Sequence, residues 1–249
     1  MKKVFWIGLL FAGLIFSGCE KESTGALDLN FVAYYGSKPM VIGEKYAYAG
    51  GAQLFFERAK FFISDVQLIA ENGAVLYAKD AEIVNFTNVN IDSTSAKAGR
   101  KITINNLPTG NYKSIIFKIG LSDALNSMKP TDFPNDHPLA DSEPYWADWK
   151  SYIFVTLSGR ANFDADNTFE TGFVYHLGGD GVVKTKTFSK DFSISETTAA
   201  SANFKLDLEK VFINENGTLD IKTINQVHTQ VDLMRAMSVD FEKALTLTE

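Results

Sequence analysis

The sequence predicts an all-β protein: an antiparallel, immunoglobulin-like β-sandwich with one long irregular insertion and a helix at the C-terminus. Three observations predict this class. Apolar and polar residues alternate near both ends of the chain, short aromatic and β-branched runs lie between them, and turn residues separate these runs. Many short strands with frequent turns are typical of a sandwich or barrel.

The strands are predicted from period-two alternation. Residues 27–31 and 204–208 alternate between apolar and polar side chains. Successive side chains of a strand point to opposite faces, so this pattern indicates strands buried on one face. The other predicted strands are residues 54–56, 61–69, 81–86, 102–107, 114–119, 151–157, 172–176 and 187–194.

Two segments have helical character. Residues 123–129 predict a helix of one or two turns, and apolar residues recur near helical spacing over residues 231–245. The segment 134–149 fits neither pattern, although it holds two of the three tryptophans. Long irregular segments inside a compact chain are usually functional or disordered, and the aromatic content here argues against disorder.

The N-terminus resembles a bacterial lipoprotein signal. Lys2 and Lys3 precede an apolar run over residues 4–16, and Ser17-Gly18-Cys19 follows. The run is shorter than the roughly 20 residues that span a bilayer. We therefore expect a signal peptide at residues 1–18, a lipidated Cys19 with a tether at 19–26, and one domain at 27–249. A plain secretory signal is the alternative.

The next residues suggest where the lipoprotein is located. Residues 20–22 resemble the acidic export tag of surface lipoproteins of Bacteroidetes, which predicts an outer membrane lipoprotein on the periplasmic or cell-surface face. Removal of residues 1–18 changes the formal net charge from −6 to −8. An acidic chain without a cluster of basic residues argues against nucleic acid as a partner.

Cysteine content limits the chemistry. Cys19 is the single cysteine, which excludes an intramolecular disulfide and a cysteine-based metal site. No Gly-x-Ser-x-Gly elbow and no glycine-rich phosphate loop occurs, so no enzyme class is indicated. About 230 mature residues can bury one core.

Several motifs together resemble one family. Residues 62–68 resemble its "YISNVQL" strand, residues 108–120 its "PAGTY…F.VG" segment, and residues 174–178 its "FHLG" strand. The residues that resemble its central signature are Leu125-Asn126, His137-Pro138-Leu139, Tyr145-Trp146, Trp149 and Tyr152. In this order, the motifs resemble the MbnP-like family of copper-associated periplasmic proteins and Bacteroidetes lipoproteins.

The resemblance implies a β-rich protein that binds one copper ion. His137 and His176 are then the metal-ligand candidates, and His228 is a third ligand or a surface residue. In some members a di-haem peroxidase-like partner oxidises a tryptophan to kynurenine, which makes Trp146 or Trp149 the candidate here. The chain departs from the family pattern at residues 33–35, where many members have a histidine, and at Pro144, where a methionine is frequent.

These residues also have plainer interpretations. Imidazole suits copper, but a histidine beside a proline can equally bind a loop carbonyl, and a strand histidine can be a satisfied core residue. Trp146 and Trp149 would share a face in a turn of helix, for stacking or for core filling. The leading hypothesis is a lipid-anchored, non-catalytic copper-binding or copper-handling protein. The alternatives are a surface adhesion or glycan-binding lipoprotein that uses the two tryptophans, or a structural family member without the metal.

Overall fold

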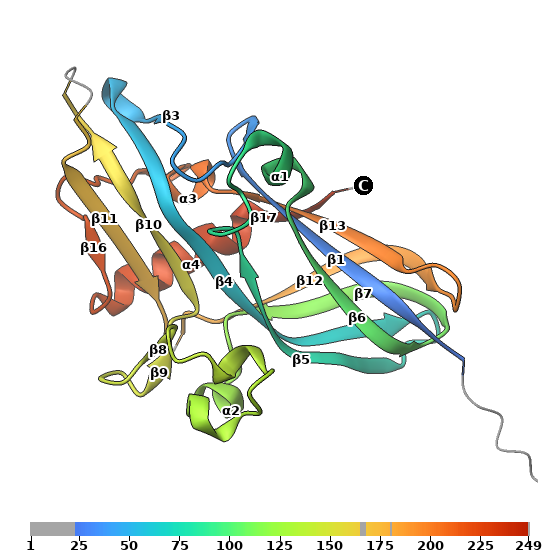
Figure 1. Cartoon of the computed structure of the whole chain (residues 1–249). Coiled ribbons are helices and arrows are strands. Elements are labelled where there is room, and N and C mark those ends of the chain that lie inside the picture. Colours follow the sequence, from blue (N-terminus) through green and yellow to red (C-terminus); the bar gives the residue numbers. More distant parts are fainter. Residues whose placement is uncertain (1–22, 165–167, 180, 249) are drawn as a thin grey trace, which may run out of the picture.

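The computed structural model describes residues 23–164, 168–179 and 181–248 and consists mainly of two β-sheets (Figure 1). The predicted signal peptide and Cys19 lie outside the described residues. The predicted tether ends earlier than expected, because the first strand already begins at Thr24. Within the described residues, no helix is both long and apolar enough to cross a membrane.

The smaller sheet has the order β17-β13-β1-β2, with β6 also paired to β1. β1 runs antiparallel to β2 and β6 but parallel to β13. Its strands are β1 (Thr24–Tyr35), β2 (Lys38–Pro39), β6 (Arg100–Pro108), β13 (Ala200–Asp207) and β17 (Leu245–Thr248).

The larger sheet has the order β12-β7-β4-β10-β11-β16, with β3 and β5 also paired to β4. Its strands are β3 (Tyr46–Ala47), β4 (Gln53–Ala70), β5 (Val75–Asn85), β7 (Gly110–Ile119), β10 (Val155–Asn162), β11 (Thr171–Leu177), β12 (Lys184–Ile194) and β16 (Gln226–Val227). The predicted sandwich is confirmed, and the parallel pairs β1–β13 and β11–β16 are the departures from a purely antiparallel arrangement.

Short elements connect the strands. The helices are α1 (Ser93–Ala98), α2 (Asp123–Asn126), α3 (Glu209–Phe212) and α4 (Val231–Ala244), and the 3-10 turns are η1 (Ala49–Gly51), η2 (Pro130–Asp132) and η3 (Pro138–Ala140). Two small hairpins are formed by β8 (Tyr145–Trp146) with β9 (Ser151–Tyr152) and by β14 (Ile213–Asn214) with β15 (Gly217–Thr218). The two predicted helices correspond to α2 and α4.

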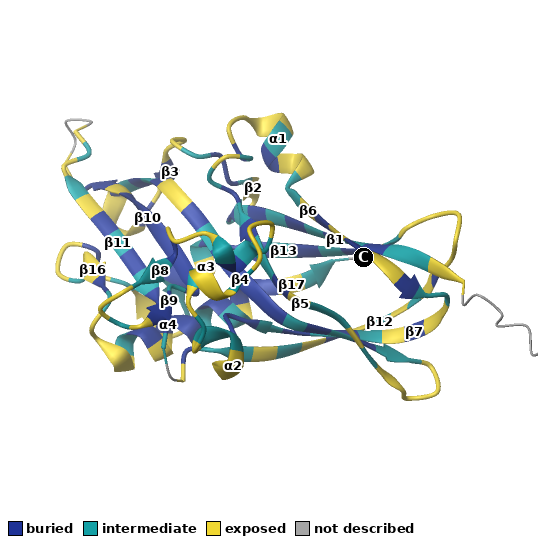
Figure 2. Cartoon of the chain, turned by 60° about the horizontal axis from the view of Figure 1, so that its bottom comes forward, coloured by how far each residue is buried: buried dark blue, intermediate teal, exposed yellow. Residues whose placement is uncertain are grey.

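Aromatic side chains join the two sheets. Phe31 of β1 stacks on Phe204 of β13 with ring centroids 4.8 Å apart. The same ring meets Phe61 of β4 edge-on at 5.8 Å and Phe117 of β7 at 6.1 Å. All four rings are almost completely buried. In Figure 2 the strands of both sheets carry the buried residues, drawn in dark blue. Each such ring pair contributes about 0.5–1.5 kcal/mol beyond the area it buries.

Helix α4 covers one end of this core. Its buried residues include Met234, Met237 and Phe241, and the Phe241 ring lies 5.2 Å from that of Phe61. The last carbonyls of a helix have no partner within the helix. Here the Lys186 ammonium donates to the Glu242 and Leu245 carbonyls, so a cation caps the negative end of the helix dipole.

Strand β4 determines where the irregular insertion leaves the sheet. Along one edge, β4 pairs first with β10 and then with β7, and residues 120–154 connect these two strands. The Phe62 amide donates to the Phe154 carbonyl at 2.9 Å, and the Phe62 carbonyl accepts from the Gly120 amide at 2.8 Å. Both ends of the insertion are therefore fixed at one residue of β4.

A glycine of β10, opposite a bulge in β4, gives a test of the packing. A Cβ on Gly159 would lie 2.0 Å from the Phe55 carbonyl oxygen and 2.7 Å from the Phe173 ring. We expect Gly159→Ala to lower the free energy of unfolding by about 1–3 kcal/mol, because backbone and ring must both shift. Gly172→Ala is the matched control, since nothing lies within 4 Å of a Cβ there. Urea denaturation measures both; equal stabilities would contradict the packing described.

Candidate functional site

The insertion at residues 120–154 forms a compact unit below the larger sheet in Figure 1, built from α2, η2, η3 and the β8–β9 hairpin. The Asn126 side chain holds this hairpin. Its Oδ1 accepts from the Tyr152 amide at 2.9 Å and from the Ser151 hydroxyl at 3.0 Å. Tyr152 in turn donates to the Leu139 carbonyl at 2.8 Å, which connects the hairpin to η3.

His137 attaches the insertion to β5. Its Nδ1 accepts from the Leu139 amide at 3.1 Å, so Nε2 carries the proton and donates to the Asp80 carboxylate at 2.9 Å. The imidazole also stacks on Phe133, with centroids 4.5 Å apart. Both ring nitrogens are engaged in this arrangement, and a metal ion would have to displace one bond. The role of His137 as a ligand remains a prediction.

His176 lies in β11 on the sheet face that the hairpin covers. Thr156 of β10 pairs with both His176 and Lys60 of β4, so these three residues form one row across three strands. The His176 Nδ1 is buried and has no hydrogen-bond partner in the described part of the chain. Burial, followed by the nearby His228, lowers the pKa of His176 to about 4. The imidazole is therefore neutral at pH 7.

His228 reaches the same place through a parallel pair. β16 pairs with β11 through Val174–Gln226 and Tyr175–Val227, and the next residue of each segment is a histidine. The Trp146 ring meets His176 edge-on at 5.5 Å and lies stacked on His228, also at 5.5 Å. Two imidazoles, one from β11 and one from the bend after β16, thus contact one indole. His137 has a separate set of neighbours, which the predicted pairing of His137 with His176 did not anticipate.

The two tryptophans stack on each other. Their ring centroids lie 4.6 Å apart and their planes differ by 13°. They share a face as predicted, but through a turn and not a helix, since Trp146 lies in β8 and Trp149 in the turn that follows. Gly178 leaves room for this pair: a Cβ there would lie 3.1 Å from the Trp149 ring and 2.8 Å from the Tyr152 carbonyl oxygen.

An ion pair holds the other side of the hairpin. Glu143, which precedes the buried Pro144, pairs with Lys60 and lies 3.4 Å from Arg58. The Lys60 side chain is only 10% exposed, so its charge has lost most of its hydration. Removing the partner of such a charge is costly, which indicates that Glu143 fixes the hairpin over the His176 row.

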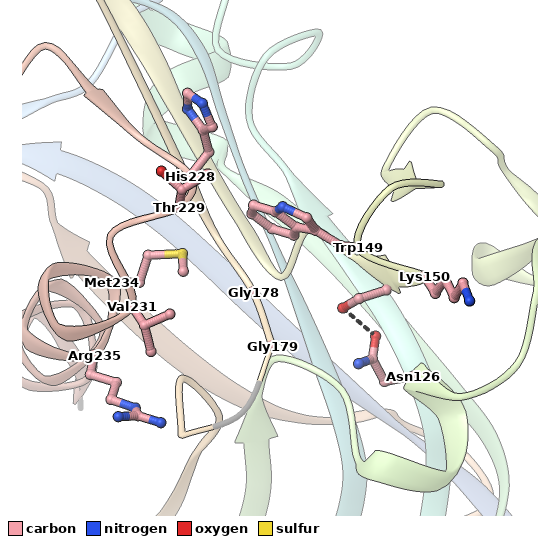
Figure 3. Close-up of a pocket in the computed structure, with 11 residues that line it drawn as sticks. Asn126, Trp149, Lys150, Gly178, Gly179, His228, Thr229, Val231, Met234 and Arg235 are labelled. Carbon is pink, nitrogen blue, oxygen red and sulfur yellow. Dashed lines mark hydrogen bonds between the residues drawn. The ribbon is translucent and has the colours of Figure 1, made fainter.

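An open cleft adjoins the stacked pair (Figure 3). Its volume is about 610 Å³, within the range of small-ligand sites. Trp149 and His228 form part of its wall, and Met234 and Val231 of α4 lie below His228. Trp146 and His176 are not among its lining residues, so His228 is the histidine that the cleft reaches.

Few side chains near the cleft could act as metal ligands. In the ranges that the structure describes, no group of three or more His, Cys, Asp or Glu side chains could hold a metal ion. Two imidazoles remain, and the Nδ1 of His176 is a buried nitrogen without a hydrogen-bond partner among the described residues. Such an atom is costly unless it binds something, so the residues present fit a two-histidine ligand set for a soft or borderline ion.

The role of His137 as an anchor can be tested. We expect His137→Ala to lower the free energy of unfolding by about 1–3 kcal/mol, because it removes two hydrogen bonds and a stacked ring. Asp80→Asn should cost less, since its amide oxygen still accepts from Nε2. Chemical denaturation compares the variants, and a His137→Ala protein as stable as the original would disprove the anchor.

His176 predicts a pH dependence for the metal-free protein. Its folded pKa of about 4 lies below the ordinary value of 6.5, so the unfolded chain binds a proton first. Stability should therefore fall by up to about 3 kcal/mol as the pH drops from 6.5 to 4, with no further loss from this group below 4. His176→Gln should flatten this slope in denaturation curves at pH 7, 5.5 and 4. An unchanged slope would contradict the assignment.

Comparison with known proteins supports the family. The family model described as MbnP matches residues 24–233. MbnP from Methylosinus trichosporium superposes with a TM-score of 0.51 over 76% of this chain and 78% of that one, at 16% identity, which supports a common fold. No curated protein matches the sequence. Because the family model covers most of the chain, the protein belongs to the MbnP family.

Proposed function

We propose that this protein is a lipid-anchored, non-catalytic copper-binding protein in which His176 and His228 hold the metal beside Trp146. The observation that carries the proposal is the buried Nδ1 of His176, which has no partner among the residues that the structure describes, in a side chain that lies near a second imidazole. Membership of the MbnP family supports copper as the ion, given the resemblance to copper-associated proteins.

The protein's own residues supply what a copper site needs. His176 is neutral at pH 7 and fixed in a strand, so its lone pair costs little to organise. His228 lies at the cleft, where an ion can enter from solvent. Bound copper would give the protein a redox-active, transferable cation; the residues themselves orient the nitrogen donors and exclude water from the His176 side.

Trp146 is our candidate for oxidation to kynurenine. It contacts both histidines, whereas Trp149 has no ring contact with either in the described part of the chain. A di-haem peroxidase-like partner would supply the oxidising equivalents. A modified Trp146 would place the new carbonyl and amine groups beside the two imidazoles.

The lipoprotein-like N-terminus of the sequence supports the proposed anchor. Lipidation of Cys19 would leave a short segment before β1, which begins at Thr24, and so would hold the sandwich close to the membrane surface. This favours a protein that receives or delivers copper at the outer membrane, on the periplasmic or the cell-surface face.

Copper titration against a competing chelator tests the proposal. We expect the wild-type protein to bind one copper ion, and His176→Ala and His228→Ala each to weaken binding about tenfold or more, a loss of about 1.4 kcal/mol or more. His137→Ala is the matched control, because it removes an imidazole of this segment that is already hydrogen-bonded. It should lose stability and keep its copper affinity.

Two results would overturn the proposal. If the His176→Ala, His228→Ala double variant binds copper as tightly as wild type, the site lies elsewhere. If wild type binds no copper, the protein is a family member that kept the fold without the metal. A glycan-binding role is less favoured, because Trp146 and Trp149 turn ring faces toward each other.

A further inference from the structure

The stacked tryptophans differ in their access to the surface. Trp149 lines the open cleft, whereas Trp146 does not and lies against the two histidines. The indoles are nearly parallel, with centroids 4.6 Å apart. A path through touching π-systems therefore runs from the cleft to the ring that contacts His176 and His228.

Several contacts hold the two indoles in this stacked position. The β8–β9 hairpin is fixed by Asn126 on one side and by the Glu143–Lys60 ion pair on the other. Gly178, which directly follows the end of β11, leaves space for the Trp149 ring. Core filling alone would not require two half-buried indoles to stack at the rim of a cleft.

We propose that Trp149 is an electron-transfer relay through which Trp146 is oxidised by a metal-centred one-electron oxidant at the cleft. This inference rests on the proposed oxidation of Trp146. The oxidant takes one electron from Trp149, and the Trp149 radical cation then takes one electron from Trp146. Trp146 loses its Nε1 proton to water, which leaves a neutral indolyl radical beside the histidines and a reduced oxidant.

The relay can be tested on the purified, copper-free protein. Tris(bipyridine)ruthenium(III), generated in solution by a light flash, serves as the oxidant. Transient absorption follows the tryptophan radical, and peptide mapping by mass spectrometry identifies the oxidised residue. In wild type we expect the oxidation product at Trp146.

Conservative variants separate electron transfer from packing. Trp149→Phe keeps a stacked ring that is difficult to oxidise, so formation of the Trp146 radical should slow at least about tenfold. Trp149→Tyr restores an oxidisable ring and should recover part of the rate. Tyr145→Phe is the control in the same hairpin, because Tyr145 contacts Tyr152 and should not affect the rate.

The outcomes distinguish this inference from the copper proposal. If Trp149→Phe oxidises Trp146 at the wild-type rate, or if the wild-type product forms at Trp149 alone or at neither indole, the relay is wrong. Copper titration of Trp149→Phe is read separately: the relay variant should bind copper like wild type. Loss of the relay with intact copper binding therefore supports the inference, and absence of copper binding in wild type overturns only the metal site.

Discussion

The site depends on how strand β4 divides its edge between two partners. β10 occupies the first half of this edge and β7 the second, and both strands leave it at the same place. The 35-residue connection between them, residues 120–154, therefore starts and ends at Phe62, whose amide and carbonyl bind its two ends. The entropic cost of bringing the ends of a loop together grows only slowly with its length, so a long connection is tolerated between these two strands. The sandwich can thus carry an irregular segment without giving up core packing.

The fixed ends of the insertion do not by themselves order the residues between them. Three separate side-chain interactions do. His137 bonds to Asp80 on β5, Glu143 pairs with Lys60 on β4, and Asn126 holds the hairpin from within. Each uses a different strand or loop, so the hairpin cannot rotate about any one of them. Trp146 is consequently held against His176 of β11 and against His228, which directly follows β16. This is the arrangement expected of a preorganised site, in which supporting contacts position the groups that bind.

Much of the fold could be predicted from the sequence, since alternation and turn residues reflect burial directly. The strands over residues 27–31 and 204–208, the C-terminal helix and the irregular segment all follow from local pattern. Strand β4 was predicted as two pieces because Glu57 and Arg58 are both exposed where β4 bulges opposite β10, which breaks the alternation. The tether was predicted too long because β1 begins before its alternation becomes clear.

The site was harder to predict because its contacts are not local. His228 comes beside His176 through β16, a strand of only two residues that pairs in parallel and has no periodic signal. The partner of His137 lies 57 residues away in β5, so a histidine beside a proline offers no clue to that bond. The stacking of the two tryptophans could not be predicted, because it depends on the turn that follows β8. Motif resemblance identified His137, His176 and the two tryptophans as candidates but not His228, and three-dimensional pairing decides which of these residues meet.

The pairing of the two indoles also makes the site optically visible. Trp146 and Trp149 are the two tryptophans that remain after residue 18. If residues 1–18 are removed as proposed, the indole emission of the remaining chain would arise from these two stacked rings alone. Their coupling to each other and to two imidazoles makes that emission sensitive to any event at the hairpin. The molecule therefore carries an intrinsic fluorescent label at the one place where ligand, oxidation or loop movement would be expected to register.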